Sequence, residues 1–345
     1  MEHSCRVGIV ACSNGLSLHA KEEMLQLNKT LCALGTEVIW SDFIYAKDGV
    51  RNGTGKERAD ALMNFYRDKN VDFIFDVSGG DVSQEVLDYL DYEVIAAARG
   101  KDGKRKVFWG YSDLTVLLNA IYAKTGNPGV LYQVRYIENM LQNNVVNMNE
   151  TEAEIGTGIT EKSLCGIRNN LFTPRYHFLR GEEMSGVLVG GNVRCLLKLS
   201  DTEYFPDMTG KILFLEARSG FEKEMRSYLS QLQQMGVFEK INGLFLGTFT
   251  RWDEENIRVA QQEALRKEKA LKQGVRTKDC GEKEQMTMER LVLEYIPKEL
   301  PVAKTLEVGH ASTSKAIRIG EHLHLLGDGV LEYIENEALE MEYNL

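Results

Sequence analysis

The sequence predicts an α/β protein built on a parallel β-sheet. Across residues 6–126, short apolar runs rich in β-branched and aromatic residues alternate with longer stretches that carry apolar residues at helical spacing. The short runs are apolar at successive positions, as in strands buried on both faces of a parallel sheet. With 345 residues, the chain is long enough for two domains that each bury a core. We therefore expect a parallel sheet covered by helices, followed by a second unit.

Four strands and four helices are expected in this first region. The strands, in chain order, are residues 7–11, 37–40, 71–77 and 106–109, and the helices that follow them are 18–34, 56–67, 82–90 and one that begins at about residue 113. Asp81 is expected to cap the third helix, with Gln84 completing a capping box. Ligands of open α/β sheets bind beyond the carboxyl ends of the strands, so function is expected in the loops there.

Regularity is lost over residues 136–182, a polar and aperiodic stretch that predicts a linker. The predicted organisation is an N-terminal domain over 1–135, this linker, and a C-terminal domain over 183–345. The charge-dense stretch 253–297 predicts two exposed helices around a loop near 274–281. The other elements expected in the C-terminal domain are a helix up to residue 199, a helix at 221–235, and strands at 186–189, 211–215, 243–246, 305–308, 316–319 and 322–326.

The charge balance and the cysteine pattern limit the function classes. The chain has 41 basic and 51 acidic residues, a formal net charge of −10, which argues against binding to nucleic acid or to anionic membranes. No apolar run reaches membrane-spanning length, and no secretory leader precedes the first strand. The six cysteines form no CxxC pair, so reduced thiols in a cytoplasmic protein are expected.

Neither a cofactor nor a metal ion is expected. The sequence lacks the G-x-G-x-x-G and Walker A motifs, which leaves a dinucleotide or nucleoside triphosphate site poorly supported. His322 and His324 could share one face of a strand as metal ligands. No further ligand stands nearby at metal-binding spacing, so two solvent-facing histidines are the favoured interpretation.

Ser112 stands on a predicted strand-to-helix turn. It follows the apolar run 106–109 and Gly110, which allows a sharp turn, and it directly precedes the predicted helix. Its hydroxyl can project into a cleft there, while backbone N–H groups at the helix start face a developing negative charge. A nucleophilic serine occupies such a position. The alternative is an ordinary helix N-cap, the commoner role of serine in this setting.

Gly79 and Gly80 end the preceding strand. If that strand neighbours the one that leads to Ser112, a glycine N–H group could lie close to the serine. Together with the N–H of Asp113 it would form an oxyanion hole. The alternative is a plain tight turn.

Glu216 and His310 are candidates for an acid and a base. Glu216 follows the apolar run 211–215, where an unpaired buried charge is costly, so it needs a partner. A histidine imidazole and the nearby Arg218 are both suitable partners. His310 follows an apolar segment and Gly309, and of the six histidines it is the best placed to face another strand end. A structural histidine is the alternative.

Five motifs in this order resemble the LD-carboxypeptidase family of serine peptidases, which includes murein tetrapeptide carboxypeptidases and microcin C self-immunity peptidases. The similarity runs from about Val7 to Leu326. The motifs are Gly79-Gly80, Gly110-Tyr-Ser-Asp113, Gly190-Gly191-Asn192, Leu213-Phe-Leu-Glu216 and Gly309-His310.

The resemblance implies a triad in which Ser112 is the nucleophile, His310 the general base and then acid, and Glu216 the group that orients the histidine. A serine needs such a base at neutral pH, and a carboxylate sets the tautomer of the base. The chain has no G-x-S-x-G motif, so an α/β-hydrolase is less well supported by the sequence.

The resemblance also implies an oxyanion hole, a fold and an assembly. The hole would use the N–H groups of Gly80 and Asp113, with Gly79 and Asn192 beside the substrate. The implied fold is an N-terminal flavodoxin-like parallel sheet domain and a smaller C-terminal β-rich domain, with the site between them. A homodimer is implied as well. Two segments depart from the family pattern, Leu131-Tyr-Gln-Val134 and Thr313 to Gly320.

Two substrates and one non-catalytic role follow from these observations. A murein peptide that ends in D-alanine is favoured over a peptidyl or aminoacyl nucleotide. A nucleotide needs aromatic rings to stack on, and none of the three tryptophans lies in the predicted linker, where the remaining stacking candidates are Phe172, Tyr176 and Phe178. Candidate cations for a substrate carboxylate are Arg175, Arg194 and Arg218. A ligand-binding α/β protein without catalysis is the competing class.

Overall fold

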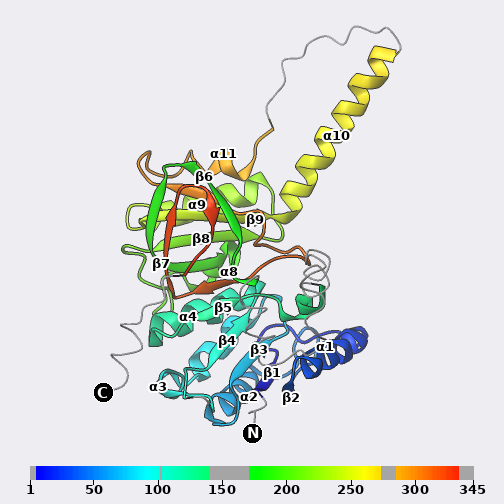
Figure 1. The fold of residues 1–345 in the computed structure, drawn as a ribbon, viewed down its shortest axis with the longest axis vertical. Coiled ribbons are helices and arrows are strands. Elements are labelled where there is room, and N and C mark those ends of the chain that lie inside the picture. Colours follow the sequence, from blue (N-terminus) through cyan, green and yellow to red (C-terminus); the bar gives the residue numbers. More distant parts are fainter. Residues whose placement is uncertain (1–4, 102, 140–170, 273–284, 334–345) are drawn as a thin grey trace, which may run out of the picture.

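The computed structural model describes residues 5–101, 103–139, 171–272 and 285–333. Figure 1 shows two β-sheet units stacked along the long axis of the molecule, the N-terminal one in blue to cyan and the C-terminal one mainly in green to red. The predicted loop near 274–281 and most of the predicted linker lie outside the described residues.

The N-terminal sheet has the strand order expected of a flavodoxin-like domain. Its parallel strands are ordered β2-β1-β3-β4-β5. Their bounds are Cys5–Val10 for β1, Thr36–Trp40 for β2, Phe73–Asp76 for β3, Val107–Gly110 for β4 and Gly129–Leu131 for β5. The predicted parallel sheet is therefore confirmed, and β5 is a strand that the sequence reading did not include.

Helices cover both faces of this sheet. Val7 and Ile9 of β1 pack into one apolar cluster with Leu27 and Leu31 of α1, while α2 and α4 contribute to a second cluster that includes Val10 and Ile74. The elements are η1 (Leu18–Ala20), α1 (Lys21–Ala33), α2 (Gly55–Arg67), η2 (Ser83–Tyr89), α3 (Tyr92–Ala97), η3 (Ser112–Leu114), α4 (Thr115–Thr125) and η4 (Val134–Tyr136). The helices predicted at 18–34 and 56–67 are confirmed, and the first of them ends at Ala33.

A strand from the other end of the chain completes the N-terminal sheet. β11 (Ile317–Ile319) pairs antiparallel with β5, so that Ile317 faces Leu131. A strand at 316–319 was expected, within the C-terminal domain. Its pairing with β5 covers an edge that would otherwise expose unpaired backbone groups.

The C-terminal sheet is ordered β12-β7-β8-β9-β10-β6-β13 and curls into a barrel-like unit. Its four central strands are parallel, and the flanking pairs are antiparallel. A bridge between Leu323 and Tyr333 links β12 to the chain just after β13. The bounds are Arg175–Arg180 (β6), Glu183–Asn192 (β7), Ile212–Ala217 (β8), Gly243–Phe249 (β9), Val302–Lys304 (β10), His322–Leu326 (β12) and Gly329–Val330 (β13).

Several elements differ from the sequence expectation in this half, among them β13, which was not predicted. β6 lies within the stretch 136–182 that we expected to be a linker. The strand expected at 305–308 lies instead at Val302–Lys304, where Val302 and Ala303 are buried between β9 and β6. The second helix of the charged stretch, α11 (Met288–Val292), is not exposed, because it buries Met288, Leu291 and Val292.

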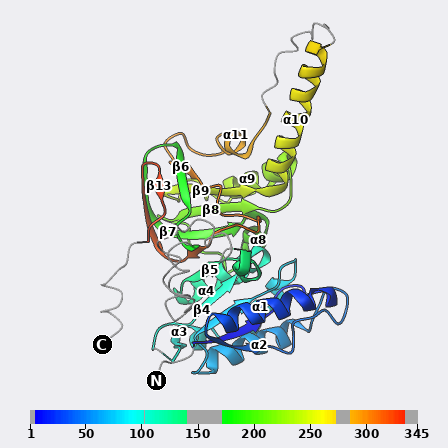
Figure 2. The same cartoon turned by 45° about the vertical axis from the view of Figure 1, so that its right-hand side comes forward.

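The remaining helices pack against or project from this sheet. They are α8 (Val193–Leu196), η5 (Leu197–Leu199), α9 (Glu222–Gln234) and α10 (Thr250–Lys272). Figures 1 and 2 show that α10 leaves the body of the molecule, and its Ile257 and Leu265 are exposed. Within the described ranges, no helix combines the length and the apolar character needed to cross a membrane.

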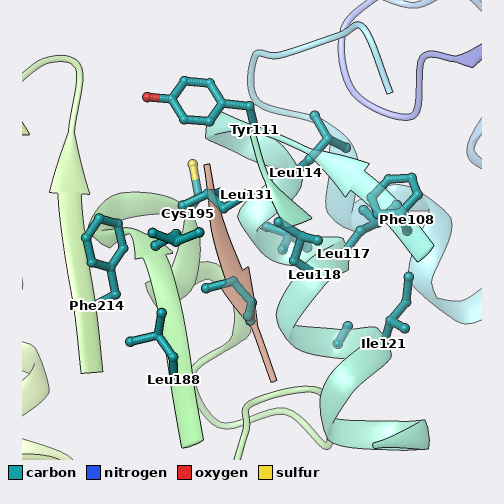
Figure 3. Packing of buried hydrophobic residues seen from close by; sticks show 14 of the residues in the cluster. Phe108, Tyr111, Leu114, Leu117, Leu118, Ile121, Leu131, Leu188, Cys195 and Phe214 are labelled. Atoms are coloured by element: carbon teal, nitrogen blue, oxygen red, sulfur yellow. The ribbon is translucent and has the colours of Figure 1, made fainter. Parts of the chain in front are cut away.

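Helix α4 joins the two units. Its residues from Thr115 to Ile121 are all buried, a pattern expected only for a helix enclosed on every side. Leu117 and Leu118 belong to the same apolar cluster as Leu188 of β7 and Phe214 of β8 (Figure 3). The helix that follows Ser112 is therefore fixed by both units.

Candidate active site

Ser112 occupies a sharp turn between β4 and α4. Its φ angle is 55°, in the left-handed region that residues other than glycine seldom enter. The turn continues as the 3₁₀ helix η3, and α4 begins at Thr115 rather than near residue 113. Ser112 is the first residue of η3, and no side chain caps this helix, so the N-cap alternative is wrong. Backbone strain of this kind is held in place by surrounding structure and clusters at active sites.

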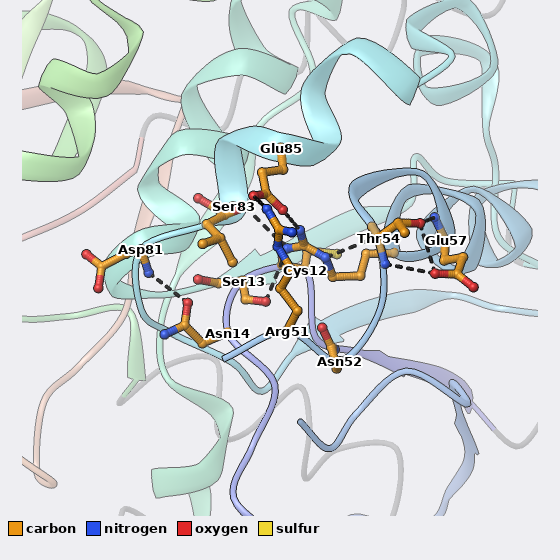
Figure 4. A network of polar contacts seen from close by, with 12 residues as sticks. Cys12, Ser13, Asn14, Arg51, Asn52, Thr54, Glu57, Asp81, Ser83 and Glu85 are labelled. Atoms are coloured by element: carbon orange, nitrogen blue, oxygen red, sulfur yellow. Dashed lines mark hydrogen bonds and ion pairs between the residues drawn. The ribbon is translucent and has the colours of Figure 1, made fainter. Parts of the chain in front are cut away.

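The Gly79-Gly80 loop lies beside Ser112. A Cβ atom added to Gly79 would stand 3.9 Å from the Cβ of Ser112. Gly80 has a φ of 136°, and a Cβ there would meet the Asn14 side chain at 2.1 Å. The backbone N–H of Asn14 donates to the carbonyl of Gly79 at 3.2 Å. The side-chain Oδ1 of Asn14 accepts from the backbone N–H of Asp81 at 3.0 Å (Figure 4). Gly80 therefore leaves no room for a side chain, whereas a Cβ at Gly79 would make only an ordinary van der Waals contact with the serine.

The Asp113 carboxylate is a buried anchor. It accepts hydrogen bonds from the Ser13 hydroxyl at 2.6 Å and the Ser83 N–H at 2.9 Å, and it pairs with Lys198. Burial would raise its pKa, but the hydrogen bonds from Lys198 and Ser13 outweigh burial and hold the pKa of Asp113 below its ordinary value. The side chain thus ties η3 to three other segments.

The predicted capping box at Asp81 is wrong. The helix η2 begins at Ser83 after Val82, without a side-chain cap. Its first N–H group, that of Ser83, binds the Asp113 carboxylate instead, and the Asp81 carboxylate pairs with Arg194 of the C-terminal unit. A contact between distant segments replaces the local one here.

Glu216 and His310 form a buried pair. Nδ1 of His310 donates to Oε2 of Glu216 across 2.7 Å. Glu216 is fully buried at the end of β8, and an ion pair with Arg218 is not formed. A carboxylate only accepts, so this contact places the imidazole proton on Nδ1 and leaves Nε2 as the basic nitrogen. Among the described protein atoms, the buried Nε2 has no hydrogen-bond partner.

Two glycines allow His310 to reach Glu216. A Cβ on Gly247 would lie 2.6 Å from the carbonyl oxygen of Val308 and 3.0 Å from the Cβ of Glu216. A Cβ on Gly309 would lie 1.7 Å from the Thr248 hydroxyl. The segment before His310 can pack against the end of β9 only because both positions lack side chains.

Tyr111 is a site residue that the sequence reading did not single out. Its ring centroid lies 4.5 Å from that of His310, with the two planes inclined by 52°. Burial, and then the negative charge of Glu216, raise the pKa of its hydroxyl well above the ordinary value. The residue next to Ser112 therefore packs on the histidine of the other unit. The only available signal was its place in the motif beside the serine.

The Gly190-Gly191-Asn192 motif forms the joint between the units. Asn119 of α4 makes two hydrogen bonds of 2.8 Å to the backbone of Gly190. The N–H of Asn192 donates to the Thr115 hydroxyl at 3.0 Å, and its side chain caps α8. A Cβ on Gly191 would meet that same hydroxyl at 2.6 Å. Asn192 pairs in register with Glu216, so the joint lies directly beside the acid; its expected substrate contact stays a prediction.

The two histidines considered as metal ligands do not share a site. His324 is exposed and contacts Glu183 at 2.8 Å, whereas His322 is partly buried on the same strand. In the described parts of the chain, no three side chains of the metal-binding types converge.

Two family models match most of the chain. The LD-carboxypeptidase N-terminal domain matches residues 7–133, and the LD-carboxypeptidase C-terminal domain matches residues 185–325. The matched ranges include the Ser112 turn in the first case and the Glu216–His310 pair in the second.

Individual relatives have low sequence identity to this chain, but their alignments cover most of both proteins. A probable murein peptide carboxypeptidase of Bacillus subtilis is 24% identical over 299 residues, which cover 83% of this chain and 79% of the relative. The microcin C7 self-immunity protein MccF of Escherichia coli is 25% identical over 268 residues, 72% of this chain and 76% of the relative. The crystal structure of a muramoyltetrapeptide carboxypeptidase from Oxalobacter formigenes aligns with a TM-score of 0.65 at 19% identity, over 94% of this chain and 97% of that one. The structural match is a likeness of fold.

Proposed function

The chain belongs to the LD-carboxypeptidase family of peptidases, and from that premise we propose that it is a serine peptidase acting through an acyl-enzyme. Its proposed reaction is release of the terminal D-alanine from a murein tetrapeptide. The proposed catalytic residues are Ser112, His310 and Glu216.

The observation that carries this proposal is the 2.7 Å contact between His310 Nδ1 and Glu216 Oε2, combined with a basic Nε2 that no described protein group occupies. With its proton held on Nδ1, the imidazole accepts the Ser112 proton at Nε2 as the hydroxyl attacks the substrate carbonyl. The same nitrogen then donates that proton to the leaving amine. The contact between Tyr111 and His310 supports bringing the serine turn and the histidine together.

The oxyanion of the tetrahedral intermediate would be bound by the backbone N–H groups of Gly80 and Asp113. Gly79 lies beside Ser112, which supports this assignment. The N–H of Asp113 stands at a helix start, where the peptide dipoles favour negative charge.

A peptide substrate is supported over a nucleotide by the packing of the aromatic residues. Trp109 and Trp252 are buried, and the indole of Trp40 donates to Asn28 at 2.9 Å on an edge strand. Phe172 is buried against Trp109 and Tyr176 against Phe245, so of the three linker candidates only Phe178 is partly exposed. Stacking on a base needs an open aromatic face.

Arg218 is the best candidate to bind the carboxylate of the substrate. Arg175 pairs with Glu307, and Arg194 pairs with Asp81. Arg218 is exposed and follows the Glu216 strand end by two residues. A terminal carboxylate is well matched by a guanidinium group.

The relatives leave a second substrate to be tested. MccF has been solved in complex with aspartyl sulfamoyl adenosine and with glutamyl sulfamoyl guanosine. We include the former in the panel below. A cytoplasmic location and a homodimer belong to the same proposal, by analogy with the family.

The test is product analysis by mass spectrometry on a murein tetrapeptide, the corresponding tripeptide, and aspartyl sulfamoyl adenosine. We expect loss of one alanine from the tetrapeptide alone, and no reaction in Ser112→Ala. Cleavage of the sulfamoyl compound alone would favour the nucleotide substrate. No cleavage of any member, with binding of one of them retained, would make the chain a ligand-binding protein.

A further inference from the structure

Resting on the proposed hydrolysis, we infer that Arg194 and Lys198 are positioning residues that hold the oxyanion hole in shape from the opposite unit. Both belong to the segment after β7, Arg194 on α8 and Lys198 on η5. Neither is proposed to touch the substrate. Each binds a loop that carries one of the two N–H donors, Gly80 and Asp113.

Arg194 and Asn14 fix the peptide group that follows Gly80. Arg194 donates to the Gly80 carbonyl at 3.3 Å and pairs with the Asp81 carboxylate. The N–H of this same peptide group, that of Asp81, donates to Asn14 at 3.0 Å. The preceding peptide group is held through the Gly79 carbonyl, which accepts from the Asn14 N–H at 3.2 Å.

These contacts matter because glycine has the least restricted backbone of all residue types, so the conformation of Gly80 depends on its surroundings. The Gly80 N–H belongs to the peptide group shared with Gly79, which the Asn14 backbone holds. At a φ of 136°, with no side chain to restrict rotation, the angle between this group and the following one is fixed only if the following group is held as well. The peptide group between Gly80 and Asp81 is bound by Asn14 and by Arg194, and only Arg194 belongs to the C-terminal unit. Without it, the Gly80 N–H could turn away from the oxyanion, and a preorganised donor would be lost.

Lys198 connects the two donor loops to each other. Its ammonium group donates to the Asp81 carbonyl at 2.9 Å and pairs with the buried Asp113 carboxylate. One cation therefore spans from the residue after Gly80 to the residue after Ser112. Because its side chain is only 18% exposed, this contact is shielded from solvent.

The charges favour a positioning role over a substrate-binding one. Arg194 pairs with the Asp81 carboxylate and Lys198 with the Asp113 carboxylate, so each cation already has a carboxylate partner. A cation that binds a substrate carboxylate would be expected to stand unpaired.

The same segment also fixes the acid of the triad. α8 begins after Asn192, which caps it and pairs in register with Glu216. Arg194 and Lys198, which we call the clamp, thus belong to the same unit as the His310–Glu216 pair. Ser112 and both oxyanion donors belong to the other unit. The packing of the two units against each other therefore sets the position of the oxyanion hole relative to the triad.

The experiment compares wild type, Arg194→Gln, Arg194→Lys and a control, Arg226→Gln. Arg226 is also a half-exposed arginine of the C-terminal unit in ion pairs, but its partners are Glu222 and Glu294. Two readouts are used: kcat and KM for the tetrapeptide, and the rate at which a small fluorophosphonate labels Ser112. The fluorophosphonate carries no carboxylate, so its labelling rate does not depend on recognition of a substrate carboxylate.

For Arg194→Gln we expect kcat and the labelling rate to fall together by about 10- to 100-fold, less than the loss of an entire oxyanion donor, with KM changed less than about threefold. Arg194→Lys should recover part of the loss, because an ammonium group can make one of the two contacts. The control should match wild type, and the unfolding temperature of every variant should stay within a few degrees.

Three results would overturn the inference. An Arg194→Gln variant with wild-type kcat and labelling rate would show that the clamp does not position the donors. A raised KM with an unchanged labelling rate would make Arg194 a substrate-binding residue. Wild-type protein that neither hydrolyses the tetrapeptide nor reacts at Ser112 would remove the proposed function, and the inference with it, which distinguishes that failure from the first two.

Discussion

The two units contribute strand ends of opposite character to the site. At the N-terminal strand ends, the carboxylates Asp76 and Asp113 are saturated with hydrogen bonds from neighbouring loops. At the C-terminal strand ends, Glu216 and His310 bind each other, but Oε1 of Glu216 and Nε2 of His310 are buried without a partner among the described atoms.

This contrast distinguishes residues that stabilise the fold from residues that carry out the proposed reaction. A buried polar atom without a partner costs free energy, so it persists only where something else requires it. Removing a saturated carboxylate should therefore damage folding, whereas altering the unsaturated pair should damage catalysis. The predictions that follow test this division.

The largest effect is expected for Glu216→Gln. An amide cannot hold the imidazole proton on Nδ1 in the same way, so we expect kcat to fall by about 10⁴-fold. The unfolding free energy should change by less than about 1 kcal/mol, because the replacement keeps the shape of the side chain. Steady-state kinetics and urea unfolding measure the two effects. Loss of stability comparable to the loss of activity would make Glu216 a scaffold residue.

Asp113→Asn should show the reverse balance. The substitution leaves Lys198 without its buried carboxylate partner and weakens the contacts to Ser13 and Ser83. We expect a loss of about 3 kcal/mol in the free energy of unfolding, in the range seen when one member of a buried pair is removed. Urea unfolding near pH 7 gives this value. A variant as stable as wild type would contradict the anchoring role.

The pH dependence of stability should reveal Asp76. Burial raises the pKa of this carboxyl to about 6, from 3.8. The folded state then holds the proton more tightly than the unfolded state, so the contribution of Asp76 to stability is full below pH 3.8 and is lost as the pH rises through 6. Between pH 4 and pH 7 this amounts to about 2 kcal/mol.

Unfolding of wild type and Asp76→Asn should be compared over that range. Wild type should gain stability relative to the variant as the pH falls, because asparagine does not titrate. A difference that is independent of pH would show that Asp76 is ionised throughout.

The smallest effect is expected at Tyr111. Its hydroxyl is buried without a hydrogen-bond partner within the described atoms, so Tyr111→Phe should leave unfolding temperature equal or slightly higher. Tyr111→Leu, which removes the ring beside His310, should lower kcat by about tenfold while KM stays unchanged. Equal kcat in both variants would mean that the ring does not position the histidine.

The strand-end residues could be predicted from the sequence because each follows a recognisable apolar run. Glu216 stands directly after such a run and Ser112 follows one after a two-residue turn, and strand ends of parallel sheets converge in space. The parallel order of the first sheet followed from strand–helix alternation for the same reason.

Contacts between distant segments could not be predicted in this way. β11 is a typical strand by pattern, but nothing local indicates that it pairs with β5 of the other unit. Asp81 has the pattern of a helix cap and instead pairs with Arg194, 113 residues away. The local pattern predicted β11 correctly as a strand and Asp81 wrongly as a helix cap, and tertiary packing determined the partner in both cases.

The central claim is that the His310–Glu216 pair activates Ser112. The most direct test is the rate of fluorophosphonate labelling, with the modified residue identified by peptide mass spectrometry, in wild type and His310→Ala with and without added imidazole. We predict modification of Ser112 alone, a rate lowered by about 10²- to 10⁴-fold in His310→Ala, and partial recovery with imidazole. Modification at another residue, or equal rates in wild type and His310→Ala, would contradict the claim.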